Sequence, residues 1–146
     1  SDIFAGRSVS RTVKAGYTNG LFDLMLTEAE TAPEGALVFV NFVDFDSLFG
    51  HRRNVSGYAA ELEKIDKRLP EFEARMKAGD MAIMTADHGC DPTWPGSDHT
   101  RENVSFLMFG PDVKPRELGR RESFADMGQT IAQHLEIEPL KHGEAC

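Results

Sequence analysis

Three short apolar runs limit the folds open to this chain more than any other feature of its sequence. Residues 36–43 (ALVFVNFV) are nearly all apolar and rich in Val and Phe, which is typical of a strand buried on both faces, as in a parallel sheet. Residues 81–86 and 104–109 form two further short apolar runs. The segment from residue 36 to residue 86 has the length of a right-handed strand–helix–strand crossover. The sequence therefore predicts an α/β fold with a mostly parallel sheet flanked by helices.

Three other stretches have the periodicity of amphipathic helices. Residues 17–31 carry an apolar stripe, and Asn19 is the residue expected to cap this helix. From residue 54 to residue 77, apolar side chains recur every three or four positions, and Pro70 is expected to kink or split this helix. Residues 126–135 predict a last helix.

Two polar loops follow the first two predicted strands and carry the residues that suggest chemistry. The first loop spans residues 44–53 and the second spans residues 87–103. Together they hold three of the five histidines and five aspartates: Asp44, Asp46, His51, Asp87, His88, Asp91, Asp98 and His99. Because ligands of α/β sheets bind beyond the carboxyl ends of the strands, we expect these side chains to gather at one sheet edge.

Carboxylate oxygens and imidazole nitrogens together indicate a divalent metal site. An all-oxygen set would favour magnesium or calcium, whereas three histidines favour manganese, zinc or iron. Six or more donors exceed the four of a tetrahedral site, so two ions are a reasonable expectation, as in enzymes of phosphoryl transfer. Taken singly, each aspartate is more often a turn former or a helix cap, and only the combination of two clusters points to a metal.

Several neighbouring residues allow two interpretations. Gly89 is expected to supply the backbone angles of a sharp bend after His88, so that adjacent side chains reach one site. Arg52 and Arg53 can either bind phosphate or solvate a helix start. Trp94 is expected to pack its loop down rather than touch a ligand, and Cys90 is expected to be dispensable as a ligand beside the aspartates and histidines.

Composition excludes several classes of function. The 146 residues suit one domain, with 24 Asp+Glu against 16 Lys+Arg and a net charge of -8, which argues against a general nucleic-acid binder. The longest apolar run is too short to cross a bilayer, and no secretory signal pattern opens the chain. Two cysteines are too few for a disulfide framework, so we expect a reduced, cytoplasmic compartment.

Five motifs stand out: residues 42–46 (FVDFD), 50–53 (GHRR), 85–94 (TADHGCDPTW), 98–102 (DHTRE) and 121–126 (RESFAD). With these motifs the chain resembles the bacterial phosphopentomutases of the alkaline phosphatase superfamily. The Asp-His-Gly element is shared across that superfamily, including the cofactor-independent phosphoglycerate mutases. The elements Cys-Asp-Pro-Thr-Trp and Asp-His-Thr-Arg-Glu are more specific to phosphopentomutases. The resemblance runs over essentially the whole chain and implies an alkaline-phosphatase-like core.

The resemblance implies an isomerase that interconverts ribose 1-phosphate and ribose 5-phosphate, and the deoxyribose pair. The family uses two Mn²⁺ ions, with other divalent metals as alternatives, and works through a phosphorylated threonine and a bisphosphate. The implied ligands are Asp46, His51 and His99 for one ion and Asp87 and His88 for the other, with Asp44 and Arg52 as supporting or substrate-contacting residues.

Parts of the family pattern have no counterpart in residues 1–146. The nucleophilic threonine, one further aspartate ligand and the cap domain are missing. The chain is therefore expected to be the carboxyl-terminal segment of the metal-binding core, inactive alone, and to associate with the missing half or with itself. The alternatives are another enzyme of the superfamily, such as a phosphoglycerate mutase or a phosphatase, or a non-catalytic metal-binding fragment.

Overall fold

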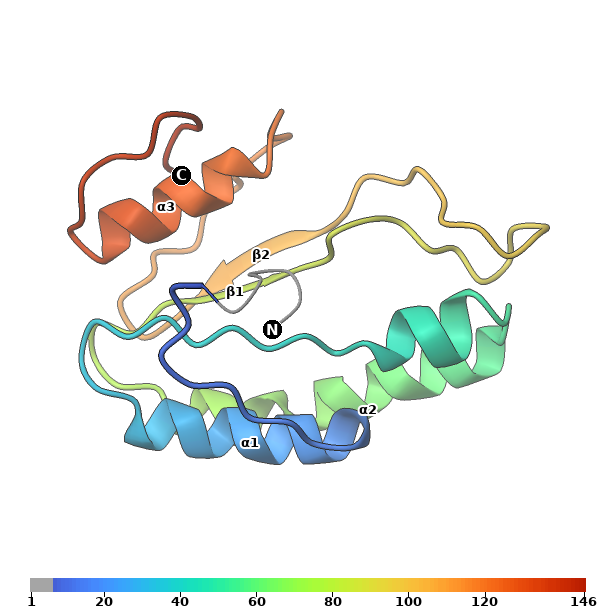
Figure 1. The fold of residues 1–146 in the computed structure, drawn as a ribbon. Helices are drawn as coiled ribbons and strands as arrows, with labels where there is room; N and C mark the ends of the chain where they lie inside the picture. Colours follow the sequence, from blue (N-terminus) through green and yellow to red (C-terminus); the bar gives the residue numbers. More distant parts are fainter. Residues whose placement is uncertain (1–6) are drawn as a thin grey trace. The chain divides into compact units, whose positions relative to one another are not determined.

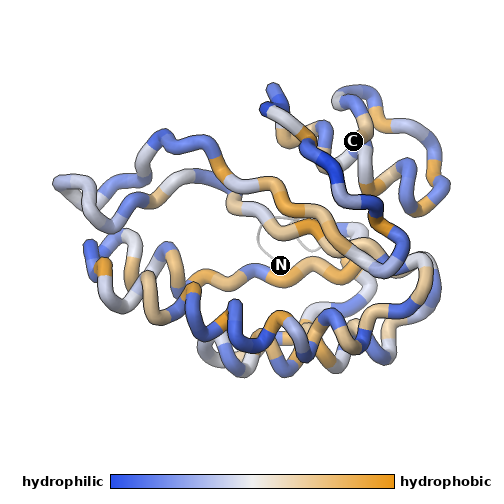
Figure 2. The backbone as a smooth tube through the Cα atoms, turned by 180° about the vertical axis from the view of Figure 1, so that it is seen from behind, coloured by the Kyte–Doolittle hydropathy of each residue, from blue (hydrophilic) through white to orange (hydrophobic). Residues whose placement is uncertain are grey.

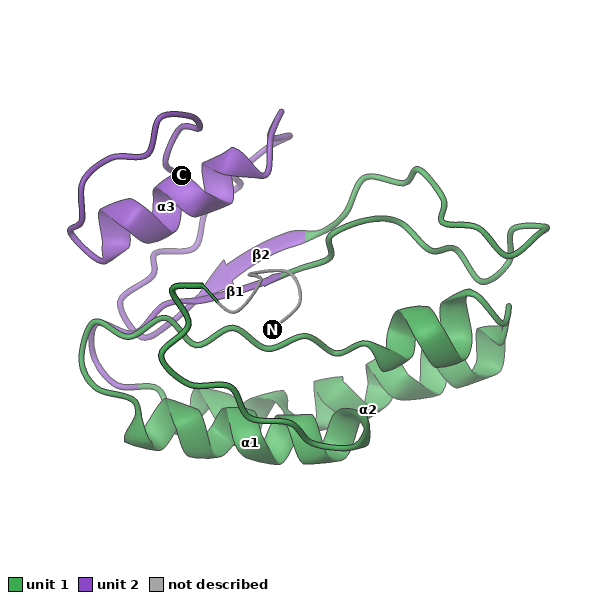
Figure 3. Cartoon of the chain, in the orientation of Figure 1, with its two compact units in different colours: residues 1–76, 85–105 green, residues 77–84, 106–146 purple. Residues whose placement is uncertain are grey.

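The computed structural model describes residues 7–146, which fall into two compact units (Figures 1 and 3). Unit 1 combines the chain up to residue 76 with residues 85–105, and unit 2 combines residues 77–84 with residues 106–146. All candidate metal ligands named above belong to unit 1. No helix in the described part of the chain has the length and apolar character needed to cross a membrane.

Two helices form the core of unit 1. Helix α1 (Tyr17–Thr31) and helix α2 (Val55–Glu73) pack against each other (Figure 1). Phe22 of α1 is buried, and the Arg68 guanidinium of α2 lies 4.5 Å from the centre of its ring, a cation–π contact. Ile65 of α2 is also buried. The first polar loop packs against α2 of this helix pair.

Helix α1 has the predicted bounds, but its cap is different. Gly16 occupies the N-cap position, and no side chain of the helix caps it, so the expectation for Asn19 is wrong. Instead, Asp44 accepts hydrogen bonds from the Thr18 backbone N–H at 2.9 Å and from the Thr18 hydroxyl at 3.0 Å. A carboxylate 26 residues further along the chain therefore satisfies an N–H that a helix leaves unpaired at its start.

Helix α2 is continuous. Asn54 caps it by accepting a hydrogen bond from the Gly57 N–H at 3.0 Å. Pro70 lies inside the helix and does not split it, contrary to one of the two expectations. The proline stands only three residues before Glu73, the last helical residue, so little helix remains beyond the backbone hydrogen bond that proline cannot donate.

Glu61 of α2 is buried and charged. Burial alone would raise the pKa of its carboxyl, but the hydrogen bond and the charge of Lys64, together with the neighbouring Thr18 side chain, outweigh burial and lower that pKa below its ordinary value. The side chains of Glu61 and Lys64 also form an ion pair.

The lowered pKa predicts acid-sensitive stability. A carboxyl with a lower pKa in the folded state than in the unfolded state stabilises the fold above the unfolded pKa. The free energy of unfolding should therefore decrease as the pH falls through the folded pKa of Glu61. Urea denaturation at several pH values measures this, and Glu61→Gln should flatten the profile below pH 4.5. The matched variant is Glu63→Gln, on the same helix but exposed; an equal flattening by that variant would contradict the assignment to Glu61.

Unit 2 contains the only paired strands in the described residues. Strands β1 (Ala82–Thr85) and β2 (Phe106–Phe109) form a two-stranded antiparallel sheet, and helix α3 (Ala125–His134) follows. The three elements fall within one or two residues of the predicted positions. Asp126 of α3 accepts hydrogen bonds from the Arg121 Nε and the Glu144 N–H, which fixes the segment after α3.

The first apolar run does not form a strand. Residues 36–43 pair with no strand of the described chain, so the predicted crossover is not confirmed. Figure 2 shows the run as a largely hydrophobic stretch, and Leu37 and Phe39 are more than 60% exposed. Apolar composition favours a strand, but a strand exists only when a neighbour supplies the ladder of hydrogen bonds. An α/β fold is shown, whereas the mostly parallel sheet is not.

Candidate metal centre

A turn of π-helix aligns the first two candidate ligands. Element η1 (Phe45–Gly50) lies where the sequence predicts an irregular loop. The His51 N–H donates to the Asp46 carbonyl at 2.9 Å, a bond between residues five apart. In an α-helix of about 3.6 residues per turn, such residues would diverge. Here the two side chains lie side by side, with His51 Nε2 3.4 Å from Asp46 Oδ1.

Helix α2 holds η1 in place. The rings of Phe45 and Tyr58 meet edge to face with their centres 5.2 Å apart. The ring of Phe49 lies so close to Gly57 that a Cβ there would be 2.5 Å from it. The glycine in the first turn of α2 therefore lets η1 approach closely.

The second loop brings two more histidines to the same place. An antiparallel bridge joins Gly89 and Thr100, the neighbours of His88 and His99. The two imidazole rings stack with their centres 3.7 Å apart and their planes 26° from parallel. The ring of His51 lies 4.7 Å from that of His99.

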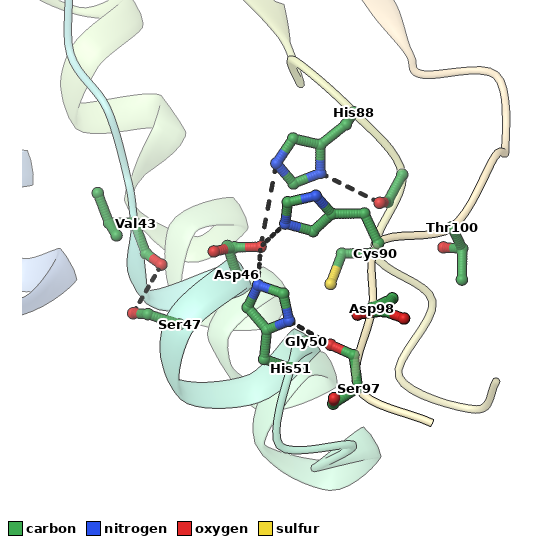
Figure 4. A network of polar contacts seen from close by, with 12 residues as sticks. Val43, Asp46, Ser47, Gly50, His51, His88, Cys90, Ser97, Asp98 and Thr100 are labelled. Carbon is green, nitrogen blue, oxygen red and sulfur yellow. Dashed lines mark hydrogen bonds and ion pairs between the residues drawn. The ribbon is translucent and has the colours of Figure 1, made fainter. Parts of the chain in front are cut away.

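One carboxylate oxygen is the centre of the cluster. Asp46 Oδ1 lies 3.3 Å from His99 Nε2 and 4.0 Å from His88 Nε2, in addition to its contact with His51 (Figure 4). The oxygen is buried and accepts no hydrogen bond from the described residues. Three ring nitrogens from two distant loops thus face one unpartnered oxygen.

The hydrogen bonds of the rings explain why this cluster fits a cation. His51 Nδ1 contacts the Ser97 carbonyl, and His88 Nδ1 lies 3.1 Å from the Gly89 carbonyl (Figure 4). A carbonyl only accepts, so in each neutral ring Nδ1 carries the proton and Nε2 carries a lone pair. The lone pairs then face a carboxylate, and a divalent cation supplies the positive charge that this arrangement lacks. The donor set therefore fits a metal.

Cys90 completes a second group of donors. Atoms of Asp46, His51 and Cys90 lie within 4.8 Å of one another, as do atoms of Asp46, His88 and His99. Burial raises the pKa of the Cys90 thiol, and the charge of Asp46 raises it further. Both Cys90 and Cys146 are free thiols.

Other residues singled out in the sequence have different positions. The Asp87 side chain is 91% exposed and lies 3.6 Å from His88 Nε2, outside both three-donor groups. Asp44 supports α1 through Thr18, as described above, and Arg52 is exposed. Trp94 is 59% exposed, so the expectation that it packs its loop down is wrong.

Asp91 has the turn-forming role that aspartates commonly have in loops. Its Oδ1 accepts hydrogen bonds from the Thr93 N–H at 2.8 Å and the Thr93 hydroxyl at 2.7 Å. These bonds lower the pKa of the Asp91 carboxyl. The Asp91 carboxylate is thus used within the loop.

Gly89 is required for a different reason from the one expected. It is not among the glycines with positive φ, so the bend does not depend on a left-handed backbone. Instead, a Cβ at this position would lie 2.8 Å from the Thr100 carbonyl oxygen and 3.0 Å from the Glu102 nitrogen. The close approach of the two sides of the loop leaves no room for a side chain.

Gly50 faces a similar restriction beside the candidate metal centre. A Cβ there would lie 2.5 Å from Cys90 Sγ and 2.9 Å from the Phe45 carbonyl oxygen. Gly50→Ala should therefore lower the free energy of unfolding by about 1–3 kcal/mol, the usual cost of overpacking. In a Cys90→Ala background the cost should be smaller, because the sulfur is gone. Urea denaturation of the four proteins of this cycle measures the coupling; equal costs in both backgrounds would show that the sulfur is not the obstacle.

Sequence reasoning missed the importance of Arg53. Its guanidinium binds backbone carbonyls on both loops, at Gly50, Asp91, Gly96 and Asp98. Backbone acceptors leave no mark in a sequence, so nothing distinguished Arg53 from Arg52.

Comparison with known proteins agrees with this geometry. The model of the metalloenzyme superfamily matches residues 8–139, and the chain belongs to that family.

Among curated proteins, the chain is similar to several phosphopentomutases. It is 56% identical over 144 residues to that of Legionella pneumophila (strain Paris), covering 98% of this chain and 35% of the relative. It is 58% identical over 144 residues to that of Sinorhizobium fredii, covering 99% and 36%. For Photorhabdus laumondii the identity is 53% over 145 residues, with the same shares. The chain thus spans about a third of the length of these relatives, and the resemblance inferred from its motifs is confirmed.

Proposed function

We propose that this chain is the metal-binding part of a phosphopentomutase. The enzyme would interconvert ribose 1-phosphate and ribose 5-phosphate, and the deoxyribose pair, through a phosphothreonine and a bisphosphate. The observation that carries the proposal is the convergence of three histidine Nε2 atoms on Asp46 Oδ1, in a chain more than half identical to proteins named phosphopentomutase.

Two Mn²⁺ ions are the proposed cofactors. Asp46, His51 and His99 would hold one ion, and Asp87 and His88 would hold the other. When bound, such ions neutralise phosphoryl oxygens and lower the pKa of an attacking hydroxyl. Other divalent metals suit the same nitrogen and oxygen donors, so availability in the cell would decide which one is bound.

This chain's own residues orient the donors. The Ser97 carbonyl holds the His51 ring, and the Gly89 carbonyl holds the His88 ring, so that both Nε2 atoms face Asp46. Asp44 fixes the start of η1 against α1 through Thr18. We place the phosphorylated threonine in the part of the relatives that this chain does not match.

Association with the rest of such an enzyme would complete the fold. Residues 36–43 expose Leu37, Val38 and Phe39, and we propose that they form a strand of a mostly parallel, alkaline-phosphatase-like sheet with segments outside this chain. The chain would otherwise associate with itself. The proposed partners are pentose phosphates, with no role for nucleic acid or a membrane, and the proposed location is the cytoplasm.

A chimeric enzyme tests the function. This chain would replace the matching third of the Legionella pneumophila phosphopentomutase, and the chimera would be assayed with Mn²⁺. We expect conversion of ribose 1-phosphate into ribose 5-phosphate, with little action on 3-phosphoglycerate or p-nitrophenyl phosphate. The unmodified Legionella enzyme is the control.

Other outcomes of that assay would contradict the proposal. A folded chimera that prefers 3-phosphoglycerate would indicate a phosphoglycerate mutase, and one that prefers p-nitrophenyl phosphate a phosphatase. A folded chimera that binds Mn²⁺ without transferring phosphate to any of these substrates would favour a non-catalytic metal-binding domain.

A further inference from the structure

We propose that Arg53 is a positioning residue that fixes the two loops of the candidate metal centre relative to each other. The proposal rests on the metal centre described under the proposed function. Arg53 contacts no side-chain atom of Asp46, His51, Asp87, His88 or His99, and its one contact with a candidate donor is that of Nη1 with Cys90 Sγ at 4.0 Å. Arg53 acts through the backbone that carries the proposed ligands.

The guanidinium of Arg53 is hydrogen-bonded on three sides. Nε donates to the Gly96 carbonyl at 2.5 Å, and Nη2 donates to the Asp98 carbonyl at 2.5 Å. Nη1 donates to the carbonyls of Asp91 at 3.0 Å and Gly50 at 3.1 Å. One side chain therefore joins the end of η1 to both sides of the second loop.

Two of these four carbonyls belong to residues that directly precede a proposed ligand. Gly50 immediately precedes His51, and Asp98 immediately precedes His99. Ser97 lies between Gly96 and Asp98, whose carbonyls both bond Arg53, and its own carbonyl is the partner of His51 Nδ1. A shift of this segment would turn the His51 ring and move His99 away from Asp46.

Only arginine can make this set of bonds. Its planar guanidinium carries five N–H donors in a fixed fork, whereas lysine carries a compact ammonium with three. The four carbonyls occupy four of the five donors of Arg53. Neither sequence interpretation of Arg53 describes this arrangement: one remaining donor is too few to clamp a phosphate, and the guanidinium bonds backbone carbonyls instead of solvating a helix start.

The backbone of Arg53 supports the same role. Its φ is +52°, a left-handed conformation that a non-glycine residue adopts only where the surroundings impose it. Arg53 lies three residues after Gly50, the last residue of η1, and directly before Asn54, the N-cap of α2. Side chain and backbone together therefore fix the exit from η1.

The test uses the chimeric enzyme described above, with three variants. Arg53→Ala removes the contacts, and Arg53→Lys retains only the charge. Arg68→Ala is the matched control, because Arg68 also makes several polar contacts, to Asn19, Asp23 and Glu71, none of which is a proposed ligand. The two readouts are the dissociation constant of Mn²⁺ and hydrogen exchange at the Asp91 and Thr100 amides, which are bonded across the second loop.

We expect Arg53→Ala to weaken Mn²⁺ binding about 10–100-fold, as loss of a ligand-orienting group does, and to accelerate exchange at both amides. The Mn²⁺ affinity and the exchange rates of Arg53→Lys should lie between those of Arg53→Ala and those of the unsubstituted chimera. Arg68→Ala should lower the melting temperature but leave Mn²⁺ affinity within about twofold.

Three results would overturn the role of Arg53. One is unchanged Mn²⁺ affinity and exchange in Arg53→Ala. Another is an equal loss of affinity in Arg68→Ala, and the third is an absence of amide protection in the unsubstituted chimera. The proposed function fails separately: a chimera inactive on pentose phosphates but sensitive to Arg53→Ala in both readouts would retain the positioning role. If the unsubstituted chimera binds no Mn²⁺, the exchange rates at the Asp91 and Thr100 amides alone decide whether Arg53 fixes the two loops.

Discussion

Asp46→Asn is expected to reduce Mn²⁺ affinity by at least about two orders of magnitude, more than the loss typical of a residue that only orients a ligand. Asp46 is the one residue common to both three-donor groups, and its buried Oδ1 faces His51, His88 and His99. Asparagine keeps the volume but removes the negative charge, and it leaves an amide among the ring nitrogens. Mutase activity of the chimera should fall with the metal. Titration with Mn²⁺ measures the affinity, with the electron paramagnetic resonance signal of the free ion as the readout.

Asp44→Ala is the matched control for that substitution. Asp44 is two residues away, but its carboxylate accepts hydrogen bonds from Thr18 instead of facing the histidines. Its loss should lower the free energy of unfolding by about 1–3 kcal/mol, because the Thr18 groups lose their acceptor. It should weaken Mn²⁺ binding clearly less than Asp46→Asn does, because Asp44 supports η1 but does not face the histidines. Equal losses of affinity in the two variants would show that Asp46 has no special place in the centre.

Helix α1 shows what a sequence pattern can and cannot predict: the bounds of the helix are correct, but its cap is not. The apolar stripe of residues 17–31 is a local signal, and α1 has the same bounds. Its cap was predicted wrongly because the group that satisfies Thr18 lies on Asp44, far along the chain. Local periodicity thus located the helix, while the contact that fixes its start depends on the tertiary fold.

The strand predicted at residues 36–43 is not found among the described residues, and the physical reason is again a partner far along the chain or outside it. An apolar composition indicates that a segment is suited to burial. A strand also needs a neighbouring strand to complete its backbone hydrogen bonds. Among the described residues, only β1 and β2 pair as strands.

For the candidate centre, the spacing of the residues was more informative than the predicted secondary structure. The sequence placed Asp46, His51, His88 and His99 on two loops expected to converge, and their side chains do meet. The π-turn that aligns Asp46 with His51 has no periodic apolar signature, so it was read as an irregular loop. The sequence correctly marked Gly89 as a residue that must be glycine, but it gave the backbone angles as the reason. The actual reason, crowding by Thr100, can be seen only in the folded loop.

Substitution of Asp87 tests which residues hold the second ion. Asp87 belongs to the ligand set that the resemblance implies, but not to either three-donor group that the structure brings together. The resemblance assigns Asp87 to the second ion with His88, and its Oδ1 lies 3.6 Å from His88 Nε2, yet its side chain is 91% exposed. Asp87→Ala in the chimera should lower the bound Mn²⁺ from two ions to one and abolish mutase activity, because a two-metal centre needs both ions to hold the attacking and leaving oxygens. Metal analysis after gel filtration gives the stoichiometry.

Asp98→Ala is the control for the Asp87 substitution, since Asp98 is an exposed aspartate of the same loop that contributes its backbone carbonyl to Arg53. It should retain both ions and activity within about twofold. If Asp87→Ala keeps two ions while Cys90→Ala loses one, the second ion is held by the group of Asp46, His51 and Cys90. A thiolate ligand would then favour softer metals such as zinc over manganese, and the metal preference of the whole enzyme would have to be measured again.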